Sequence, residues 1–281
     1  MESPVTRKKT RLGGVALRRL RSTVAYIRRK ERLSSLQGFE SIKDSNSWSV
    51  RRIAEIAKIR HAKTYLEIGV FKGNTLKSVP IPIRVGVDPF PLFNPTNTPP
   101  GVKVVVSTSD SFFRWLPRRV RFDVVFLDGL HKARQTLKDF WNAARHSNQS
   151  TVFLIDDVYP DSDLTAMPSQ RQSRLAKRLA GLETSRWHGD VWKVLIALEQ
   201  VFPEFSFRVV NSPGADSAAG EDNPQAVVWR TSPSRMTRTG LRKALRIIKR
   251  LENERFSSAV KSYPKIFELF GEDEIPRMLG R

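Results

Sequence analysis

The 281-residue sequence contains no cysteine, which excludes disulfide bonds, thiolate metal ligands and cysteine nucleophiles. It also lacks an apolar run of the roughly 18 residues that a membrane-spanning helix needs. The basic N-terminus has no apolar stretch of the kind that a secretory signal carries, so we expect no such signal. These absences agree with a cytoplasmic protein, which is the localisation we expect.

Acidic residues are few beside the basic ones: 28 Asp and Glu stand against 49 Lys and Arg, a net charge of +21. The excess is uneven, because residues 1–33 hold 11 basic and 2 acidic residues, and residues 232–281 hold 12 and 6. Such segments attract anionic surfaces, whether nucleic acid, acidic lipid or acidic glycan. We predict peripheral association with the inner face of a membrane through these segments, with nucleic acid as the less favoured partner.

Charge and apolar pattern divide the chain into three predicted parts. A basic helical arm spans residues 1–33, a globular domain spans 34–231, and a basic helical extension spans 232–281. The arm has apolar residues every three or four positions, which is the helical period; they are Leu17, Leu20, Val24 and Ile27.

From residue 64 onward the sequence alternates short apolar strands with helices, which predicts an α/β fold with a parallel sheet covered on both faces. The expected strands are residues 64–70, 84–88, 101–110, 122–128, 151–156, 205–210 and 225–230. The expected helices are residues 48–62, 74–79, 111–117, 132–147, 190–202 and 237–256, with Asp190 as a cap. The last two strands have no helix between them, which predicts an antiparallel hairpin at the edge of the sheet. Residues 158–187 are long enough to form a lid.

Acidic residues follow most of these strands. Ligands of such sheets bind at the carboxyl ends of the strands, and the acids at those ends are Glu67, Asp88, Asp110, Asp128, Asp156 and Asp157. Structural need alone does not explain so many strands ending on a carboxylate. The pattern therefore predicts a binding site at this edge.

The first strand leads into a glycine-containing turn, "LEIGVFKGN" (66–74). This is not the G-x-G-x-x-G dinucleotide fingerprint, because Glu67 stands where that motif has its first glycine. A carboxylate at this place disfavours phosphate and favours a cationic ligand. Gly69 and Gly73 would let the backbone approach that ligand, and Asp88 would accept hydrogen bonds from ribose hydroxyls.

Three features follow one another along the chain: E-x-G-x-x-x-G-N, an acid after the second strand, and D-G-x-H after the fourth. In this order they resemble the class I S-adenosylmethionine-dependent methyltransferases, and most closely the small-molecule and sugar O-methyltransferase branch. The resemblance covers about residues 60–230. It implies a Rossmann-like, seven-stranded, mostly parallel sheet whose last strand is antiparallel, with S-adenosyl-L-methionine lying over the first loop.

The resemblance also implies the cofactor-binding residues. Glu67 and Gly69 would line the methionine end of the cofactor, Asp88 the ribose, and Ser109 with Asp110 the adenine. The other positions of the motifs that we assign to the cofactor site are Phe71, Gly73, Asn74 and Asp128.

Strands four and five are expected to be neighbours, which would bring Asp128, Asp156 and Asp157 together. Clustered carboxylates repel one another unless a cation neutralises them, and Mg²⁺ prefers oxygen ligands of this kind. We therefore predict that these three acids bind Mg²⁺ or another divalent cation. The spacing resembles metal-dependent catechol-type and macrolide-sugar O-methyltransferases, and the Asp-Asp pair favours the sugar type.

His131 lies three residues after Asp128 and is the predicted catalytic base. A sugar hydroxyl is a poor nucleophile at neutral pH, and histidine is suited to removing its proton as the methyl group transfers. A bound metal would lower the pKa of that hydroxyl. The structural alternatives are that Asp157 caps a turn before Pro160 and that His131 merely begins a helix. His188 is a weaker candidate base.

Two tryptophans lie close together in "WHGDVW" (187–192). Trp187 could form a substrate wall, and we expect Trp192 to be buried in the core. The favoured function is O-methylation of a hydroxyl on a sugar or another small or glycosylated acceptor. The alternatives are a nucleic-acid methyltransferase, although no N-P-P-Y motif follows strand four, and a non-catalytic binding protein tethered by its basic arms. An oligomer is compatible with the sequence.

Overall fold

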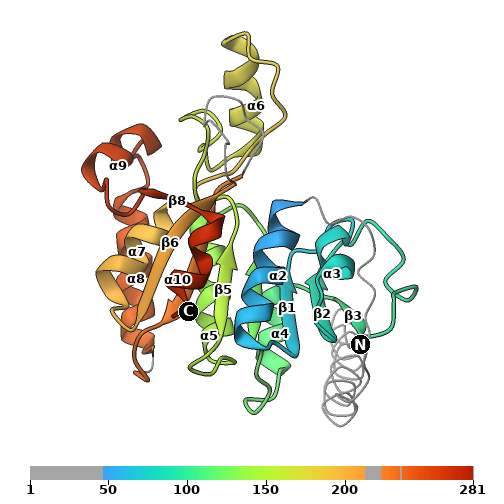
Figure 1. Ribbon diagram of the computed structural model, residues 1–281. Helices are drawn as coiled ribbons and strands as arrows, with labels where there is room; N and C mark the ends of the chain where they lie inside the picture. Colours follow the sequence, from blue (N-terminus) through green and yellow to red (C-terminus); the bar gives the residue numbers. More distant parts are fainter. Residues whose placement is uncertain (1–46, 213–222, 235, 281) are drawn as a thin grey trace, which may run out of the picture.

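The computed structural model describes residues 47–212, 223–234 and 236–280. Its centre is an eight-stranded sheet with the order β3-β2-β1-β4-β5-β7-β6-β8, shown in Figure 1. The strands are β1 (Thr64–Ile68), β2 (Ile83–Asp88), β3 (Val102–Val106), β4 (Val124–Leu127), β5 (Val152–Ile155), β6 (Phe205–Asn211), β7 (Gln225–Arg230) and β8 (Leu269–Gly271).

Strands β1 to β5 are mutually parallel, and β7 runs antiparallel to both β5 and β6. The register aligns the ends of the central strands, because Ile68 is opposite Leu127 and Leu127 is opposite Ile155. The residues that follow these three positions therefore meet at one edge of the sheet. The predicted mostly parallel α/β fold with an antiparallel strand is confirmed.

Helices cover both faces of the sheet. The described helices are α2 (Trp48–Arg60), α3 (Asn74–Ser78), α4 (Ser109–Trp115), α5 (Ala133–Ala144), α6 (Gln170–Leu179), α7 (Lys193–Val201), α8 (Arg238–Arg250), α9 (Phe256–Ser262), η1 (Glu272–Glu274) and α10 (Ile275–Met278). Side chains of a strand point alternately to the two faces, so Val125 and Leu127 join the core beneath α5 and α7. Val124 and Phe126 join the core beneath α2 and α10.

The C-terminal residues add an element that the sequence analysis does not anticipate. The short strand β8 pairs in parallel with β6 and makes the sheet eight-stranded instead of seven-stranded. The predicted hairpin of β6 and β7 is antiparallel as expected, but it is not at the edge, because β7 lies between β5 and β6 and β8 lies beyond β6. A three-residue strand is too short to show a period in the sequence. The predicted domain boundaries stay predictions.

The expected cap of the helix near residue 190 has a different role. Helix α7 begins at Lys193, and the Asp190 carboxylate instead accepts a hydrogen bond from the backbone N–H of Ala133 at 2.9 Å, at the start of α5. Trp192 is only 1% exposed and packs edge-on against Phe256 and Phe267, so its predicted place in the core is confirmed.

The segment predicted as a lid contains helix α6. Figure 1 shows α6 standing away from the sheet, beyond the edge at which β5 ends. Among the helices of the described ranges, none combines the length and the apolar character needed to span a bilayer. The predicted helical arm at residues 1–33 lies outside the described residues.

Candidate active site

Two cavities open at the carboxyl ends of the parallel strands. The larger, about 730 Å³, has most of the predicted cofactor residues in its wall: Gly69, Phe71, Asp88, Ser109, Asp110 and Asp128, together with His131. The smaller, about 380 Å³, is lined by the remainder, Glu67, Gly73 and Asn74, and shares Phe71 and Asp128 with the first. All nine predicted cofactor residues thus line one continuous region, although their individual roles stay predictions.

The charge of the larger cavity is opposite to that of the protein. The chain has a net charge of +21, yet no Lys or Arg is among the described residues that line this cavity. Its acidic lining residues are Asp88, Asp110, Asp128 and Asp139. Such a wall suits a ligand that carries a positive charge and hydroxyl groups, and it does not suit a phosphate.

Gly69 is required for packing within the protein. A Cβ atom at this position would lie 1.8 Å from the carbonyl oxygen of Asp128, and the φ angle of Gly69 is +86°. At Gly73, whose φ is +77°, a Cβ atom would lie 2.8 Å from the ring of Phe93. Both glycines line the cavities as predicted. The close approach of the loops after β1 and β4 already requires glycine at Gly69, and the predicted approach of a ligand there stays a prediction.

Asp88, the predicted ribose acceptor, organises the first loop. Its Oδ2 accepts hydrogen bonds from the backbone N–H groups of Val70 at 2.8 Å and Phe71 at 3.0 Å, and its Oδ1 accepts one from Phe90 at 2.7 Å. A carboxylate offers about four lone pairs, so Asp88 keeps acceptor capacity toward the cavity. The same side chain can thus shape the loop and bind a ligand.

Glu67 is buried, with 2% of its surface exposed. Burial raises the pKa of Glu67 to about 8; the hydrogen bond from Tyr65, at 2.7 Å, opposes this shift, and the charge of Asp88 adds to it. A cation placed beside Glu67 would favour the ionised carboxylate and lower this pKa. Glu67 is therefore suited to responding to a positively charged ligand.

Two polar residues of α5, which the sequence analysis misses, also line the larger cavity. Gln135 donates hydrogen bonds to Ser109 at 3.2 Å and to Asp139 at 3.0 Å. Burial raises the pKa of Asp139 to about 6, and hydrogen bonds from Ser109 and Gln135 oppose the shift. Their spacing of four residues on the helix places both on one face, which is the signal that could have identified them.

Two of the three predicted metal ligands lie close together with His131. Asp128, His131 and Asp157 each offer one ligand atom, and these atoms lie within 4.8 Å of one another. This set fits a divalent cation in its chemistry, because it combines two carboxylates with an imidazole. Burial raises the pKa of Asp128 well above its usual value, and the charges of Asp156 and Asp157 raise it further. Two acids and a histidine, instead of three acids, form the group.

His131 is held from one side by two acceptors. Its Nδ1 lies 2.8 Å from Oδ2 of Asp157 and 2.9 Å from the backbone carbonyl oxygen of Trp187. A carbonyl oxygen and a carboxylate both accept hydrogen bonds, so Nδ1 carries the proton and the lone pair of neutral His131 is on Nε2. Burial lowers the pKa of His131, but the hydrogen bond and charge of Asp157 outweigh it, and the net shift is upward.

Trp187 forms a wall beside this histidine. Its indole ring stacks on the imidazole with ring centroids 5.0 Å apart and an angle of 4° between the planes. Its Nε1 donates to the carbonyl of Met167 at 2.7 Å, which fixes the ring. His188 is buried, and burial lowers its pKa. A buried histidine with a lowered pKa is less basic than His131.

Asp156, the third predicted metal ligand, is not a member of the group because its carboxylate turns to other partners. Its Oδ1 accepts hydrogen bonds from Asn223 at 2.7 Å, from Gln225 at 3.1 Å and from the backbone N–H of Asp157 at 3.0 Å. Asp157 has a φ of +61°, a left-handed conformation that is uncommon for a residue with a side chain. The last of these bonds supports that backbone, so Asp156 positions Asp157.

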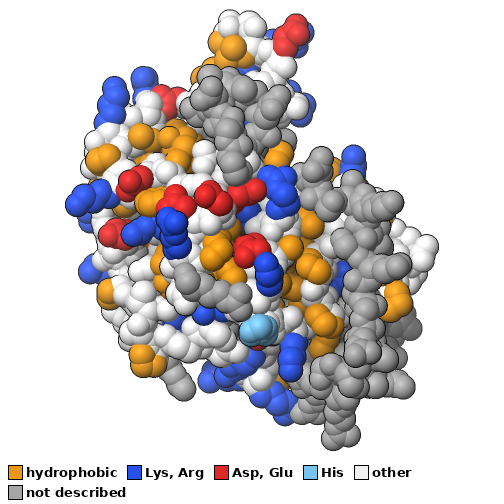
Figure 2. Space-filling view, viewed as in Figure 1, with side chains coloured by type: hydrophobic (Ala, Val, Ile, Leu, Met, Phe, Trp, Pro, Cys, Tyr) orange, Lys and Arg blue, Asp and Glu red, His pale blue; other side chains and the backbone are white. Residues whose placement is uncertain are grey.

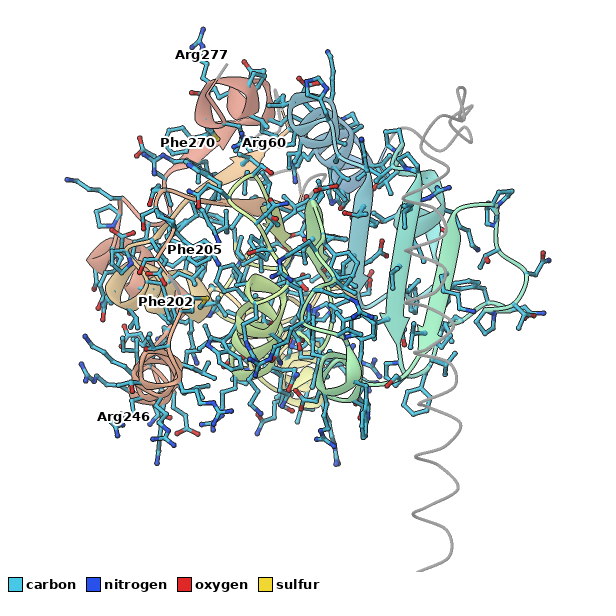
Figure 3. All side chains as sticks on the ribbon, turned by 90° about the horizontal axis from the view of Figure 1, so that it is seen from below. Arg60, Phe202, Phe205, Arg246, Phe270 and Arg277 are labelled. Atoms are coloured by element: carbon cyan, nitrogen blue, oxygen red, sulfur yellow. The ribbon has the colours of Figure 1, made fainter. Side chains whose placement is uncertain are left out.

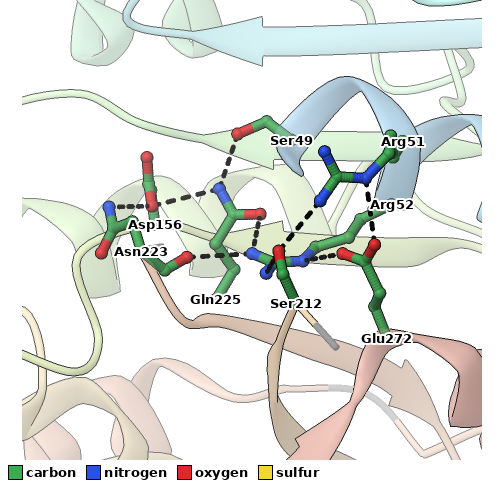
Figure 4. A network of polar contacts seen from close by, with 8 residues as sticks. All are labelled: Ser49, Arg51, Arg52, Asp156, Ser212, Asn223, Gln225 and Glu272. Atoms are coloured by element: carbon green, nitrogen blue, oxygen red, sulfur yellow. Dashed lines mark hydrogen bonds and ion pairs between the residues drawn. The ribbon is translucent and has the colours of Figure 1, made fainter. Parts of the chain in front are cut away.

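Asp156 is one end of the buried network in Figure 4. Gln225 donates to both Asp156 and Ser49, at 3.1 and 2.7 Å, and accepts from Arg52 at 3.0 Å. Arg52 also pairs with Glu272 at 3.1 Å. The network joins α2, β7 and the C-terminal residues to the turn after β5. Sequence reasoning could not find it, because each of these bonds joins residues more than 60 positions apart along the chain.

Residues 66–158 match a family of proteins described as a methyltransferase domain. This range begins in β1 and ends just after Asp157, so it contains every predicted site residue. Together with the sheet order and the acidic cavity, it confirms the class to which the chain was predicted to belong. The match covers about a third of the chain and identifies this segment as a methyltransferase domain.

The solved structures to which the chain is similar are distant in sequence. The O-methyltransferase TomG from Streptomyces achromogenes, involved in tomaymycin synthesis, is 16% identical over 64% of this chain and 78% of its own, with a TM-score of 0.41. An O-methyltransferase from Bacillus cereus is 13% identical over 74% and 90%, with a TM-score of 0.43. The N-methyltransferase NodS from Bradyrhizobium japonicum is 11% identical over 66% and 98%, with a TM-score of 0.40. No curated protein sequence matches the chain.

Proposed function

We propose that the protein transfers a methyl group from S-adenosyl-L-methionine to a hydroxyl of a sugar or of another small or glycosylated acceptor. The observation that carries this proposal is the pair of Asp157 and His131 at the wall of the larger cavity. Their contact of 2.8 Å at Nδ1 leaves Nε2 as the basic nitrogen. A base at this place is what an alcohol acceptor requires and what a more nucleophilic amine or thiol does not.

The cofactor and the residues of the chain would contribute different parts of the reaction. S-adenosyl-L-methionine supplies a methyl group on a positively charged sulfur atom. The acidic cavity wall would bind that charge, and His131 would take the hydroxyl proton at Nε2 as the acceptor oxygen attacks the methyl carbon. Asp157 would hold the resulting imidazolium, as a carboxylate partner does for a histidine base. Trp187 would restrict the acceptor to one side of the imidazole.

A divalent cation is the second part of the proposal. Asp128, Asp157 and Nε2 of His131 are the atoms that would hold it, and it would lower the pKa of a bound hydroxyl. Neutral His131 cannot use Nε2 both as a metal ligand and as a base. Metal assistance through all three residues and general-base catalysis by His131 are therefore alternatives, and they are separable by experiment.

The two other functions predicted from the sequence have less support. A polyanionic acceptor would be repelled by a cavity wall that has four acids and no described Lys or Arg. A non-catalytic binding role leaves the Asp157–His131 contact without a purpose. Peripheral membrane association through residues 1–33 and an oligomeric state stay proposals, since that arm lies outside the described residues.

Calorimetry with S-adenosyl-L-methionine and S-adenosylhomocysteine tests the cofactor directly. We expect both to bind, with binding greatly weakened in Asp88→Ala. Absence of binding by the wild-type protein would overturn the proposal. An acceptor screen with and without EDTA then tests the cation: undiminished turnover in excess EDTA would remove the metal from the proposal while leaving His131 as the base.

The cation has a second readout that does not depend on activity. Mg²⁺ or Mn²⁺ should raise the unfolding temperature of the wild-type protein, because an ion that binds only the folded state stabilises it. The effect should be lost in Asp157→Asn. Equal stabilisation of both proteins would show that the ion binds elsewhere.

A further inference from the structure

Helix α6 turns polar side chains toward the protein and apolar side chains toward solvent, the opposite of most surface helices. Its buried side chains are Ser173 and Lys177, whereas Leu175 and Leu179 are 57% and 80% exposed. Leu182, just beyond the helix, is 48% exposed. Apolar side chains normally turn inward, because removing them from water stabilises the fold. In this orientation three leucines stay exposed to solvent, so they contribute little to the stability of the fold.

Specific contacts hold this orientation. Nζ of Lys177 donates to the carbonyl of Arg186 at 2.5 Å, which ties the inner face of the helix to the returning chain. The backbone N–H of Leu182 donates to the carbonyl of Lys177 at 2.9 Å. The buried ammonium group of Lys177 is thus bonded within the protein, and the leucines cannot turn inward unless this bond breaks.

A basic stripe lies beside the leucines. Arg171, Arg174 and Arg178 are all exposed, and their spacing of three and four residues puts them on one face of the helix. Leu175 and Leu179 each follow an arginine by one position, so the apolar stripe is next to the basic one. Between residues 164 and 186 the sequence has a single acid, Glu183.

The adjacent apolar and basic stripes indicate what kind of partner binds this helix. A nucleic acid would engage the arginines through its phosphates and leave the leucines in water. An anionic phospholipid surface uses both stripes, because apolar side chains enter the headgroup–acyl boundary while basic side chains pair with the headgroups. Figure 2 shows the projecting part of the molecule, at the top, with exposed apolar and charged side chains. We infer that α6 is an interfacial helix that docks on an anionic phospholipid membrane.

The position of α6 gives the docking a direction. The helix projects from the edge of the sheet at which the cavities open (Figure 1). Trp187, at the end of the same segment, stacks on His131. Docking through α6 would therefore turn the active-site edge toward the membrane. The inference does not depend on the identity of the methyl acceptor.

The absence of cysteine makes a local test possible in the full-length protein. Leu179→Cys creates a unique site for a nitrobenzoxadiazole label, and Arg246→Cys creates a matched site on α8. Arg246 is exposed and points outward from a helix whose apolar face is buried (Figure 3). With vesicles of equal parts phosphatidylglycerol and phosphatidylcholine, the label at residue 179 should brighten about twofold or more and shift to shorter wavelength, as expected for insertion. The label at residue 246 should change little.

Each other outcome overturns the inference. No response at residue 179 from protein that co-sediments with the vesicles would place the contact elsewhere. Failure of the protein to co-sediment would show that it does not bind this membrane. A response to RNA but not to vesicles would identify a nucleic-acid surface. Equal responses at residues 179 and 246 would show non-specific adsorption.

A charge-matched comparison provides a second test. Replacing Arg171, Arg174 and Arg178 together by Gln should weaken vesicle binding about tenfold or more, because each basic residue near an acidic membrane contributes about 1 kcal/mol. Replacing Arg242, Lys243 and Arg246 by Gln removes the same charge from α8 and should weaken binding much less. An equal loss in both variants would show that only net charge matters.

Discussion

The two halves of the carboxyl edge of the sheet are built in different ways. In the half formed after β1 and β2, each functional residue lies within a few positions of its own strand, and local contacts such as Asp88 with Val70 and Phe71 shape the loop. In the half formed after β4 and β5, the key contacts come from far along the chain. His131 is held by Trp187, and Asp156 by Asn223 and Gln225.

The difference shows where specificity can vary within this fold. Under the proposed function the first half would bind the cofactor, which is common to the class, and its geometry follows from strands and turns close together in the chain. The second half would face the acceptor, and remote segments assemble it. Changes in those remote segments can alter the acceptor site without disturbing the cofactor half, and the two halves should respond separately to mutation.

The largest expected effect is on the acceptor half. His131→Ala should lower turnover about 10²–10⁴-fold, the range typical of a lost general base, while affinity for S-adenosylhomocysteine stays within a factor of about two. Steady-state kinetics and calorimetry give the two readouts. His61→Asn is the matched control, because His61 is exposed at the end of α2 with a left-handed φ of 50° that Asn tolerates. A His131→Ala enzyme with unchanged turnover would contradict the assignment of the base.

The second-largest effect is expected at Gly69, where the loop after β1 touches the loop after β4. Gly69→Ala would place a Cβ atom 1.8 Å from the Asp128 carbonyl oxygen, so it should destabilise the protein by about 3 kcal/mol or more and weaken cofactor binding. Gly181→Ala has a similar φ of +68° but no heavy atom within 4 Å, and should cost only about 1–2 kcal/mol. Urea unfolding measures both. Equal losses would show that backbone conformation, not the contact between the loops, determines the effect.

The third effect separates two adjacent carboxylates. Asp157→Asn should lower turnover by about 10–100-fold, as loss of a residue that orients a catalytic group does, and should remove the upward pKa shift of His131. Asp156→Asn keeps an oxygen that accepts the same hydrogen bonds, so its turnover should fall only about threefold or less. Kinetics and NMR titration of His131 test both variants. If Asp156→Asn instead loses metal affinity as completely as Asp157→Asn does, the original prediction of Asp156 as a ligand is restored.

The smallest effect is the pH dependence of stability in the ligand-free protein. Burial raises the pKa of Glu67 to about 8 and that of Asp156 to about 7, from ordinary values near 4. Carboxyl groups with raised folded-state pKa values stabilise the fold below the unfolded pKa, and this contribution is lost as the pH rises through the folded pKa. The unfolding temperature should therefore fall as the pH rises from about 5 to about 9.

Glu67→Gln is the control for this dependence. This variant should reduce the fall in unfolding temperature near pH 8. The fall at lower pH, which arises from Asp156, should remain. Saturating S-adenosyl-L-methionine should do the same in the wild-type protein, because its positive charge favours ionised Glu67. A decline that is unchanged in Glu67→Gln would assign it to other buried carboxyl groups.

Sequence alone determined the class of fold and which acids and glycines line the cavities at the carboxyl edge. Apolar strands of four to seven residues show themselves by composition, and the acids and glycines that follow them keep a fixed distance from the strand ends. The carboxyl edge is common to parallel strands, so Glu67, Asp88 and Asp128 had to lie near one another once the strands were recognised.

Only the tertiary structure decided what the adjacent acids do. Asp156 and Asp157 are neighbours in the chain, but the backbone at Asp157 is left-handed and the main partners of the two carboxylates differ. Asp156 accepts hydrogen bonds from Asn223 and Gln225, whereas Asp157 contacts His131 at 2.8 Å and accepts a longer bond, at 3.5 Å, from Asn223. The same holds for Asp190, which caps α5 instead of α7, and for α6, whose leucines face outward because Lys177 is tied inward. The outcomes for Asp156 and Asp190 depend on hydrogen bonds between segments distant in sequence, and that for α6 depends on a bond to the returning chain; no local pattern of residue types encodes those bonds.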